Sequence, residues 1–169
     1  MENKWYSIIY NSLLIVGVII ALCTSWFNTP SSVTGAIIGY TFIITGTLLM
    51  TGFLMSNMNS SNMIANIITF GPFIVLIGIL IYMVYLLSYY YSRITKGRIS
   101  GSYYTFMNLF IVLLIVEFIA FSNGMADKNF KLTGEINKVT GLTIYLLEIF
   151  STIIVATLGI ILKYFSTDG

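Results

Sequence analysis

Two glutamates, Glu117 and Glu148, lie inside long apolar segments of the chain, where a charge is costly. An ionised Asp, Lys or Arg at the centre of a membrane helix costs about 2.5–3.5 kcal/mol on insertion scales. Each carboxyl therefore needs a proton, a hydrogen-bond partner, a cation or water. Because a low-dielectric environment favours the neutral form of a carboxyl, these two residues are candidates for a proton- or cation-binding site.

The two carboxyls are expected at similar depths if their segments are antiparallel neighbours. Glu117 lies five residues before Ser122, and Glu148 lies nine residues after Val139. The difference of four residues corresponds to about 6 Å of helix. The carboxyls could then hydrogen-bond to each other or share one proton. Other available donors are hydroxyls and amides such as those of Asn108, Tyr145, Ser151 and Thr152.

Ser151 and Thr152 follow Glu148 by three and four residues, which places them on the same helix face. Lys128 or Lys131 would reach Glu117 only if the segment between the helices folds back. Three interpretations stay open at this point: a site of a small transporter or channel, a carboxyl pair that fixes helix packing or binds a cation on another subunit, and a Glu117 near the interface that needs no partner.

Other kinds of chemistry are excluded by composition. The chain has no histidine and a single cysteine, Cys23, so His-based haem and metal sites, cysteine clusters and Ser-His-Asp or Cys-His catalysis are ruled out. No phosphate loop, dinucleotide fingerprint or HExxH motif is present. The net charge of +2 is too small, and its cations too scattered, for nucleic-acid binding. We therefore expect a non-enzymatic protein with no cofactor.

The elements that position these residues are five apolar segments. Because about 20 apolar residues cross the roughly 30 Å hydrocarbon core, each segment is long enough to span a bilayer. Charged residues make up 8% of the chain, against about 25% in soluble domains. We expect an all-α, single-domain integral membrane bundle of five helices with short loops, or four if the first pair forms a shallow hairpin. The predicted spans are 6–27, 33–55, 67–91, 103–122 and 139–163.

Aromatic and basic residues mark the expected membrane interfaces. Trp5 and Trp26 bracket the first span and are separated by about 31 Å of helix. Arg93, Lys96 and Arg98 follow the tyrosine-rich end of the third span, where they are expected to reach lipid headgroups. Ordinary anchoring and a specific anionic-lipid site are both compatible with this pattern.

Small residues form a stripe on the second span. Gly35 and Gly39 have small-xxx-small spacing, and Gly46 lies seven residues later on nearly the same face. Such a stripe allows another helix to approach closely. It predicts either a dimerisation face or packing against the first or third span.

Two features of the chain leave local questions open. Pro72 would sit inside the third helix if that helix begins near Ile67, or in its first turn if the helix begins at the proline. With five spans, four lysines (Lys4, Lys128, Lys131 and Lys138) lie on one side, and Arg93, Lys96, Arg98 and Lys163 on the other. The positive-inside rule therefore does not assign an orientation.

Several short stretches of the sequence resemble those of a known group of proteins. These stretches are Trp5-Tyr6, Ser25-Trp26-Phe27-Asn28, Phe70-Gly71-Pro72-Phe73 and the terminal Lys163-Tyr164-Phe165-Ser166-Thr167-Asp168-Gly169. They resemble small multi-spanning membrane proteins of nucleocytoplasmic large DNA (giant) viruses. The resemblance implies a virion inner-membrane protein beneath the capsid, held by minor capsid proteins, and it transfers no functional residues.

A structural or assembly role in a membrane is the leading functional prediction. Its partners would be the lipid bilayer and other membrane or capsid proteins. The alternatives are a small ion- or proton-coupled transporter or channel that uses Glu117 and Glu148, and an accessory subunit of a membrane complex.

Overall fold

The computed structural model describes residues 2–24, 30–56, 63–96, 102–126 and 138–164. Within these ranges the chain is all-α, and the five longer helices have 23 to 27 residues each. At 1.5 Å per residue they are about 35–40 Å long, more than the thickness of a hydrocarbon core. The helices are α1 (Glu2–Thr24), α2 (Pro30–Ser56), α3 (Met63–Tyr89), α4 (Tyr91–Thr95), α5 (Ser102–Ala126) and α6 (Lys138–Tyr164).

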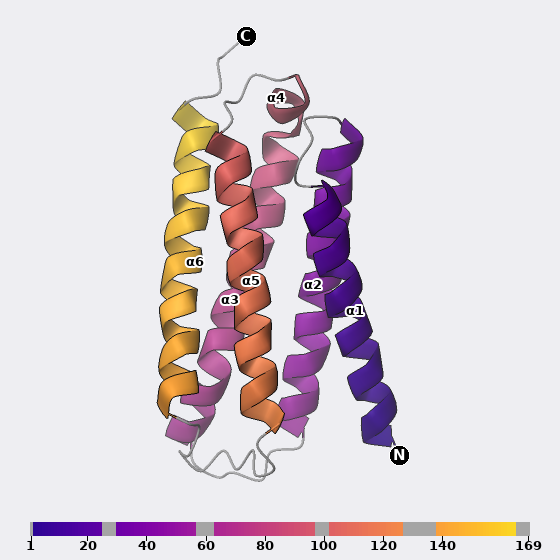
Figure 1. The fold of residues 1–169 in the computed structure, drawn as a ribbon, viewed down its shortest axis with the longest axis vertical. Coiled ribbons are helices and arrows are strands. Elements are labelled where there is room, and N and C mark those ends of the chain that lie inside the picture. Colours follow the sequence, from indigo (N-terminus) through magenta and orange to yellow (C-terminus); the bar gives the residue numbers. More distant parts are fainter. Residues whose placement is uncertain (1, 25–29, 57–62, 97–101, 127–137, 165–169) are drawn as a thin grey trace.

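The five long helices form a closed ring of neighbours. Going round the ring, α1 packs on α2, α2 on α3, α3 on α6, α6 on α5, and α5 on α1. Consecutive long helices run in opposite directions, so α1 begins at one end of the bundle and α6 finishes at the other (Figure 1). Because one long helix, α5, lies between α3 and α6 in sequence, α3 and α6 run parallel to each other.

Large side chains fill the centre of this ring. Tyr40 of α2 and Phe110 of α5 are both fully buried, and their ring centroids are 5.8 Å apart. The two helices are not neighbours in the ring, so these side chains meet across its middle. Around them lie other buried residues from four helices, including Ile43, Phe73, Leu80, Met83, Met107, Leu114 and Leu158. The interior is a packed core at this level.

The outer surface is apolar on every long helix. Exposed residues include Ile15 on α1, Leu48 on α2, Ile81 on α3, Val112 on α5 and Ile153 on α6. A helix that is apolar all round belongs in lipid rather than water. Among the described residues, α1, α2, α3 and α6 each carry a span of 19 to 23 residues, and α5 carries the shorter apolar stretch Tyr103–Ile119. The chain is a multi-pass membrane protein.

The helix ends differ from the limits of the apolar segments. The first helix ends at Thr24, so Trp26 lies outside the described residues, whereas α5 continues four residues past the predicted end at Ser122. The third helix begins at Met63, before Pro72, so the proline is inside it. Since proline has no N–H, the carbonyl of Ile68 lacks its usual partner four residues later.

A short helix that the sequence did not predict closes one end of the bundle. In α4, the side chain of Ile94 is buried, and the Tyr91 hydroxyl lies 3.3 Å from that of Thr34 in α2. The Arg93 guanidinium lies over the Tyr90 ring at 5.5 Å. These contacts hold α4 against α2 and α3, at the end where α6 finishes (Figure 1).

Candidate functional site

The two intramembrane carboxyls lie at the same depth, close to the middle of the bundle. Leu114 is the central residue of α5, and Ser151 is the central residue of α6. Glu117 follows Leu114 by three residues, and Glu148 precedes Ser151 by three. Because α5 and α6 are antiparallel, both carboxyls are displaced toward the same end, by about 4.5 Å of helix rise.

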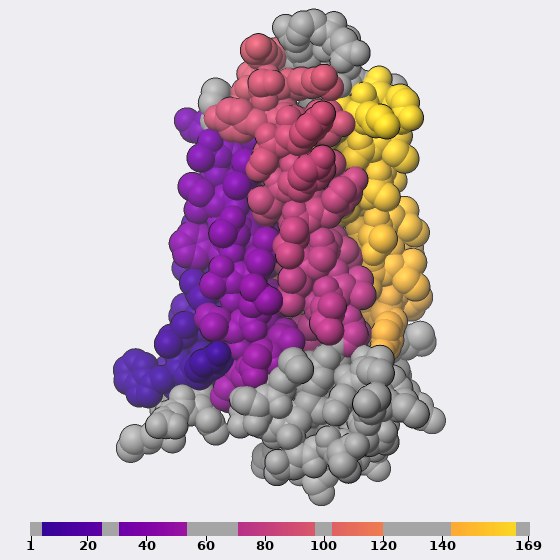
Figure 2. Space-filling view, turned by 180° about the vertical axis from the view of Figure 1, so that it is seen from behind, coloured from indigo at the N-terminus to yellow at the C-terminus, as the bar shows by residue number. Residues whose placement is uncertain are grey.

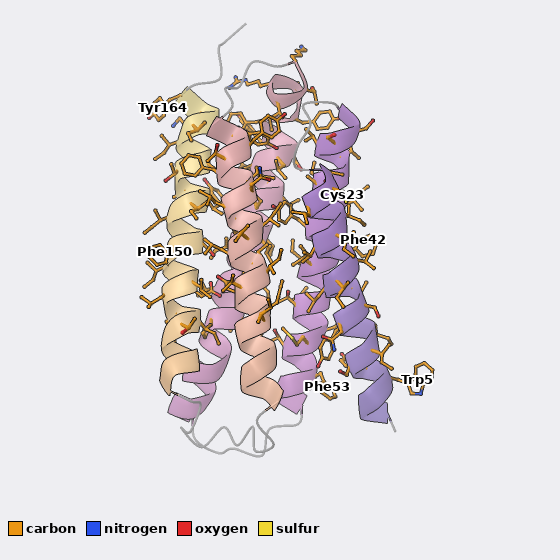
Figure 3. The ribbon with its side chains drawn as sticks, viewed as in Figure 1. Trp5, Cys23, Phe42, Phe53, Phe150 and Tyr164 are labelled. Carbon is orange, nitrogen blue, oxygen red and sulfur yellow. The ribbon has the colours of Figure 1, made fainter. Side chains whose placement is uncertain are left out.

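Both side chains are removed from the lipid. Glu117 is 1% exposed and Glu148 is 6% exposed. The adjacent positions on α6, Ile149 and Phe150, point outward, and Figure 3 shows Phe150 on the outer side of the helix. The carboxyls are therefore on the inner faces of their helices, at the α5–α6 interface.

One hydrogen bond joins the two helices at this site. The Ser151 hydroxyl donates to Glu117 Oε1 at 2.9 Å, and Ser151 is itself fully buried. Glu148 lies one turn from Ser151 on the same face of α6. Glu148 and Ser151 thus share the face of α6 that meets Glu117, so the two acidic groups and the hydroxyl form one cluster, the carboxyl cluster (Glu117, Glu148 and Ser151).

The carboxyl cluster is incompletely hydrogen-bonded. Among the described residues, Glu117 Oε2 and Glu148 Oε2 are buried atoms without a hydrogen-bond partner. A buried polar atom without a partner costs about 1–3 kcal/mol, and more if it is charged. Two adjacent carboxylates would also repel each other strongly in a low dielectric. The arrangement therefore favours binding of at least one proton, or of a cation.

Of the other predicted donors, Thr152 makes a hydrogen bond within its own helix. The Thr152 hydroxyl donates to the main-chain oxygen of Glu148 at 2.8 Å, within α6. Asn108 lies nine residues, or about two and a half turns, from Glu117 on α5, and the Tyr145 side chain is partly exposed on α6. Lys128 and Lys131 lie outside the described residues.

Metal binding has little support in the described part of the chain. No three His, Cys, Asp or Glu side chains gather there into a potential metal site. Two carboxyls and a hydroxyl offer hard oxygen ligands, whereas Ca²⁺ takes six to eight oxygen ligands. A proton or a single monovalent cation fits the carboxyl cluster better than a divalent ion.

The glycine stripe of α2 packs inside the chain, against α1. A Cβ atom on Gly39 would lie 2.9 Å from the Gly17 carbonyl oxygen, and one on Gly35 would lie 2.5 Å from the Thr24 side chain. A Cβ on Gly46 would lie 2.9 Å from the Leu14 side chain. The stripe had predicted either a dimerisation face or packing within the chain. These three glycines pack within the chain, in a close contact between α1 and α2.

Gly17 is a site residue that sequence reasoning missed. With Ala21 it forms the small-xxx-small spacing on α1 that matches the stripe on α2. Tyr40 is a second such residue, since its hydroxyl is buried without a partner among the described residues, as is that of Tyr104. A tyrosine seven residues inside an apolar span was the available signal.

The predicted interface residues divide between the two ends of the bundle. Trp5 is 68% exposed and projects outward from the start of α1 (Figure 3). Arg93 and Lys96 lie at the opposite end, on α4 and just after it. Trp26 and Arg98 lie outside the described residues.

Comparison with known proteins finds no protein-family model, no curated protein and no solved structure that matches the chain. The candidate site is therefore defined by its geometry alone.

Proposed function

We propose that this chain is a non-enzymatic structural or assembly component of a membrane. The observation that carries the proposal is the closed ring of five helices with a filled centre, where Tyr40 and Phe110 meet. At most eleven residues separate successive helices, so little of the chain extends beyond the lipid to do chemistry in water. Such a bundle acts by occupying the bilayer and by presenting its surface to neighbours.

The carboxyl cluster has a mechanical role in this proposal. It holds α5 to α6 through the Ser151–Glu117 hydrogen bond and, with one proton bound, through a second bond between the carboxyls. Replacing Glu148 by leucine removes that second bond and leaves Glu117 beside a group that can neither donate nor accept. We expect the variant to lose about 1–3 kcal/mol of stability, measured as thermal unfolding in detergent. The control, Ile149→Leu on the outer face, should unfold like the parent.

The resemblance of the sequence to giant-virus membrane proteins supports a more specific setting, a virion inner membrane beneath a capsid. The direct test is purification from native membranes or particles, followed by identification of the co-purifying proteins. Capsid proteins in near-constant ratio to this chain would support the virion setting. Recovery with subunits of a respiratory or photosynthetic complex would instead assign it as an accessory subunit.

The second candidate is a proton- or cation-coupled transporter or channel. It is favoured by one specific observation, the two buried Oε2 atoms without partners at mid-depth of the bundle. Purified protein in liposomes should then conduct protons or monovalent cations, and the double variant Glu117→Gln, Glu148→Gln should abolish the flux. The matched control is Ser88→Ala on the exposed face of α3, which should leave the flux unchanged.

The two candidates predict opposite results in the same liposomes. A structural component gives no flux above that of empty vesicles, although Glu148→Leu lowers its thermal stability. A transporter gives flux that depends on both glutamates. Unchanged stability in Glu148→Leu, together with carboxyl-dependent flux, would reject the structural proposal in favour of the second candidate.

A further inference from the structure

A groove runs along the outer surface between α3 and α6, beginning at Thr152, just past the carboxyl cluster, and continuing toward the end of α6. Its volume is about 630 Å³, and it is lined mainly by apolar side chains. Figure 2 looks onto this face, where the pink α3 meets the yellow α6. The residues that shape it are Val75, Gly78 and Tyr82 on α3, and Val155, Gly159 and Lys163 on α6.

Two glycines create the space. A Cβ on Gly78 would meet nothing within 4 Å, so this position opens directly into the groove. A Cβ on Gly159 would lie 3.1 Å from the Tyr82 hydroxyl, which therefore lies against the floor of the groove. A larger residue at either position would fill volume that is now open to lipid.

The groove has the length of one membrane leaflet. On α6 it extends from Thr152, next to the central Ser151, to Lys163 in the last turn. The eleven steps between these two residues rise about 16 Å, which is close to half of a hydrocarbon core of about 30 Å. The groove thus runs from the bilayer midplane to one interface, the path that a single acyl chain follows.

The charge at the outer end of the groove is positive. Lys163 lines this end and is exposed, with its Nζ 5.4 Å from the Tyr164 ring. Arg93 and Lys96 lie at the same end of the bundle. Among residues with described side chains, the acids are Glu117 and Glu148, which are buried on the inner faces of their helices. A negatively charged headgroup meets complementary charge at Lys163.

The Tyr82 hydroxyl adds a polar group one turn deeper than Lys163. It lies at the level of Gly159, four residues before the lysine, or about 6 Å nearer the midplane. The ester carbonyls of a phospholipid lie just below its phosphate. A donor at this depth can bind an ester carbonyl, while the lysine binds the phosphate.

We propose that the α3–α6 groove binds one anionic phospholipid. One acyl chain lies along Val75, Gly78 and Val155, the ester region meets the Tyr82 hydroxyl, and the phosphate pairs with Lys163. The occupant is a lipid of the leaflet in which α6 ends. This inference holds whether the protein is structural or a transporter.

The test is native mass spectrometry of the full chain released from detergent with phosphatidylglycerol or phosphatidylcholine of identical acyl chains. The parent should retain one phosphatidylglycerol at least several-fold more tightly than phosphatidylcholine. Lys163→Gln should weaken phosphatidylglycerol binding about fivefold, the effect of one basic residue near a membrane surface. Lys96→Gln, a cation at the same end that does not line the groove, should weaken it less than twofold.

A second pair of variants tests the acyl-chain path independently of charge. Gly78→Leu should abolish retention of the bound lipid, because the new side chain occupies the groove. The matched control is Gly52→Leu on α2, where a Cβ also meets nothing within 4 Å; it should bind like the parent. Both variants add the same side chain at an open helical position, so both should fold.

Three results would overturn the proposal. Equal binding of the two lipids would show that the headgroup is not recognised. An equal loss of phosphatidylglycerol binding in Lys163→Gln and Lys96→Gln would show that only the general surface charge matters. A doubled mass that Gly78→Leu abolishes would assign the groove to a second copy of the chain. Displacement of the lipid by inorganic phosphate alone would show an anion site without an acyl-chain path.

Discussion

Gly17 of α1 and Gly39 of α2 face each other where the two backbones are too close for any side chain. A Cβ on Gly17 would lie 2.7 Å from the Gly39 carbonyl oxygen, and a Cβ on Gly39 would lie 2.9 Å from that of Gly17. Neither atom is the end of a flexible side chain, so the helices themselves would have to separate. The contact fixes the spacing of the first helical hairpin.

Substitution of Gly39 by alanine should therefore destabilise the bundle. We expect a loss of about 1–3 kcal/mol from overpacking, reduced by up to about 1 kcal/mol through the better helix propensity of alanine. Thermal unfolding in detergent measures the effect, and Gly17→Ala should behave similarly. The control is Gly52→Ala in the same helix, which should keep or raise the stability. Equal stability of Gly39→Ala and Gly52→Ala would contradict the close contact.

Replacing Ser151 by alanine should show how much the Ser151–Glu117 hydrogen bond contributes to stability, apart from the packing of α5 against α6. Ser151→Ala leaves Glu117 Oε1 buried without its donor, and we expect a cost of about 1–3 kcal/mol in unfolding free energy. Ser88→Ala on the exposed face of α3 makes the same chemical change and should have little effect. Comparable unfolding temperatures for the two variants would argue that the hydrogen bond contributes nothing to the α5–α6 interface.

The termini of the chain should lie on opposite sides of the membrane. Five long helices that alternate in direction cross the bilayer an odd number of times. Reporters fused before Met1 and after Gly169 should therefore differ in protease accessibility in sealed vesicles. Accessibility from the same side would mean an even number of crossings, in which one of the five long helices does not span the bilayer.

Trp5 should lie near a membrane interface, at the end opposite α4. Its ring is exposed and points away from the bundle, and tryptophan prefers the headgroup level. In a Trp26→Phe variant, Trp5 is the remaining tryptophan. Its fluorescence should be quenched more by lipids brominated near the headgroup than by lipids brominated near the chain terminus. The reverse order would place the start of α1 deep in the bilayer.

The helical architecture was predictable because lipid leaves few alternatives. Every backbone N–H and C=O in the hydrocarbon core needs an internal partner, so an apolar run of about 20 residues becomes a helix. The order of helices round the ring was not predictable, since each long helix is apolar on all sides. For the same reason, an outward face of α3 or α6 could not be distinguished from an inward one before the structure.

The candidate site was predictable in part. The costs of burying Glu117 and Glu148 identified both residues, and the helical spacing identified Ser151 as a possible donor. The acceptor, however, is Glu117 on the neighbouring helix. That pairing depends on the register of α5 against α6, which apolar side chains determine collectively. Tyr40 was missed because tyrosine prefers interfaces, whereas here its ring fills the centre.

The mid-depth position of Glu117 also bears on how the polypeptide enters the bilayer during synthesis. A lone α5 leaving the translocon would present its carboxyl to hydrocarbon, and a lone α6 would do the same with Glu148. The last helix supplies what α5 lacks, since the Ser151 hydroxyl of α6 donates a hydrogen bond to Glu117. The two helices gain most by partitioning together, as a preformed hairpin. The third crossing therefore has different timing from the last two: α3 can leave alone, whereas α5 is best retained until α6 has emerged from the ribosome.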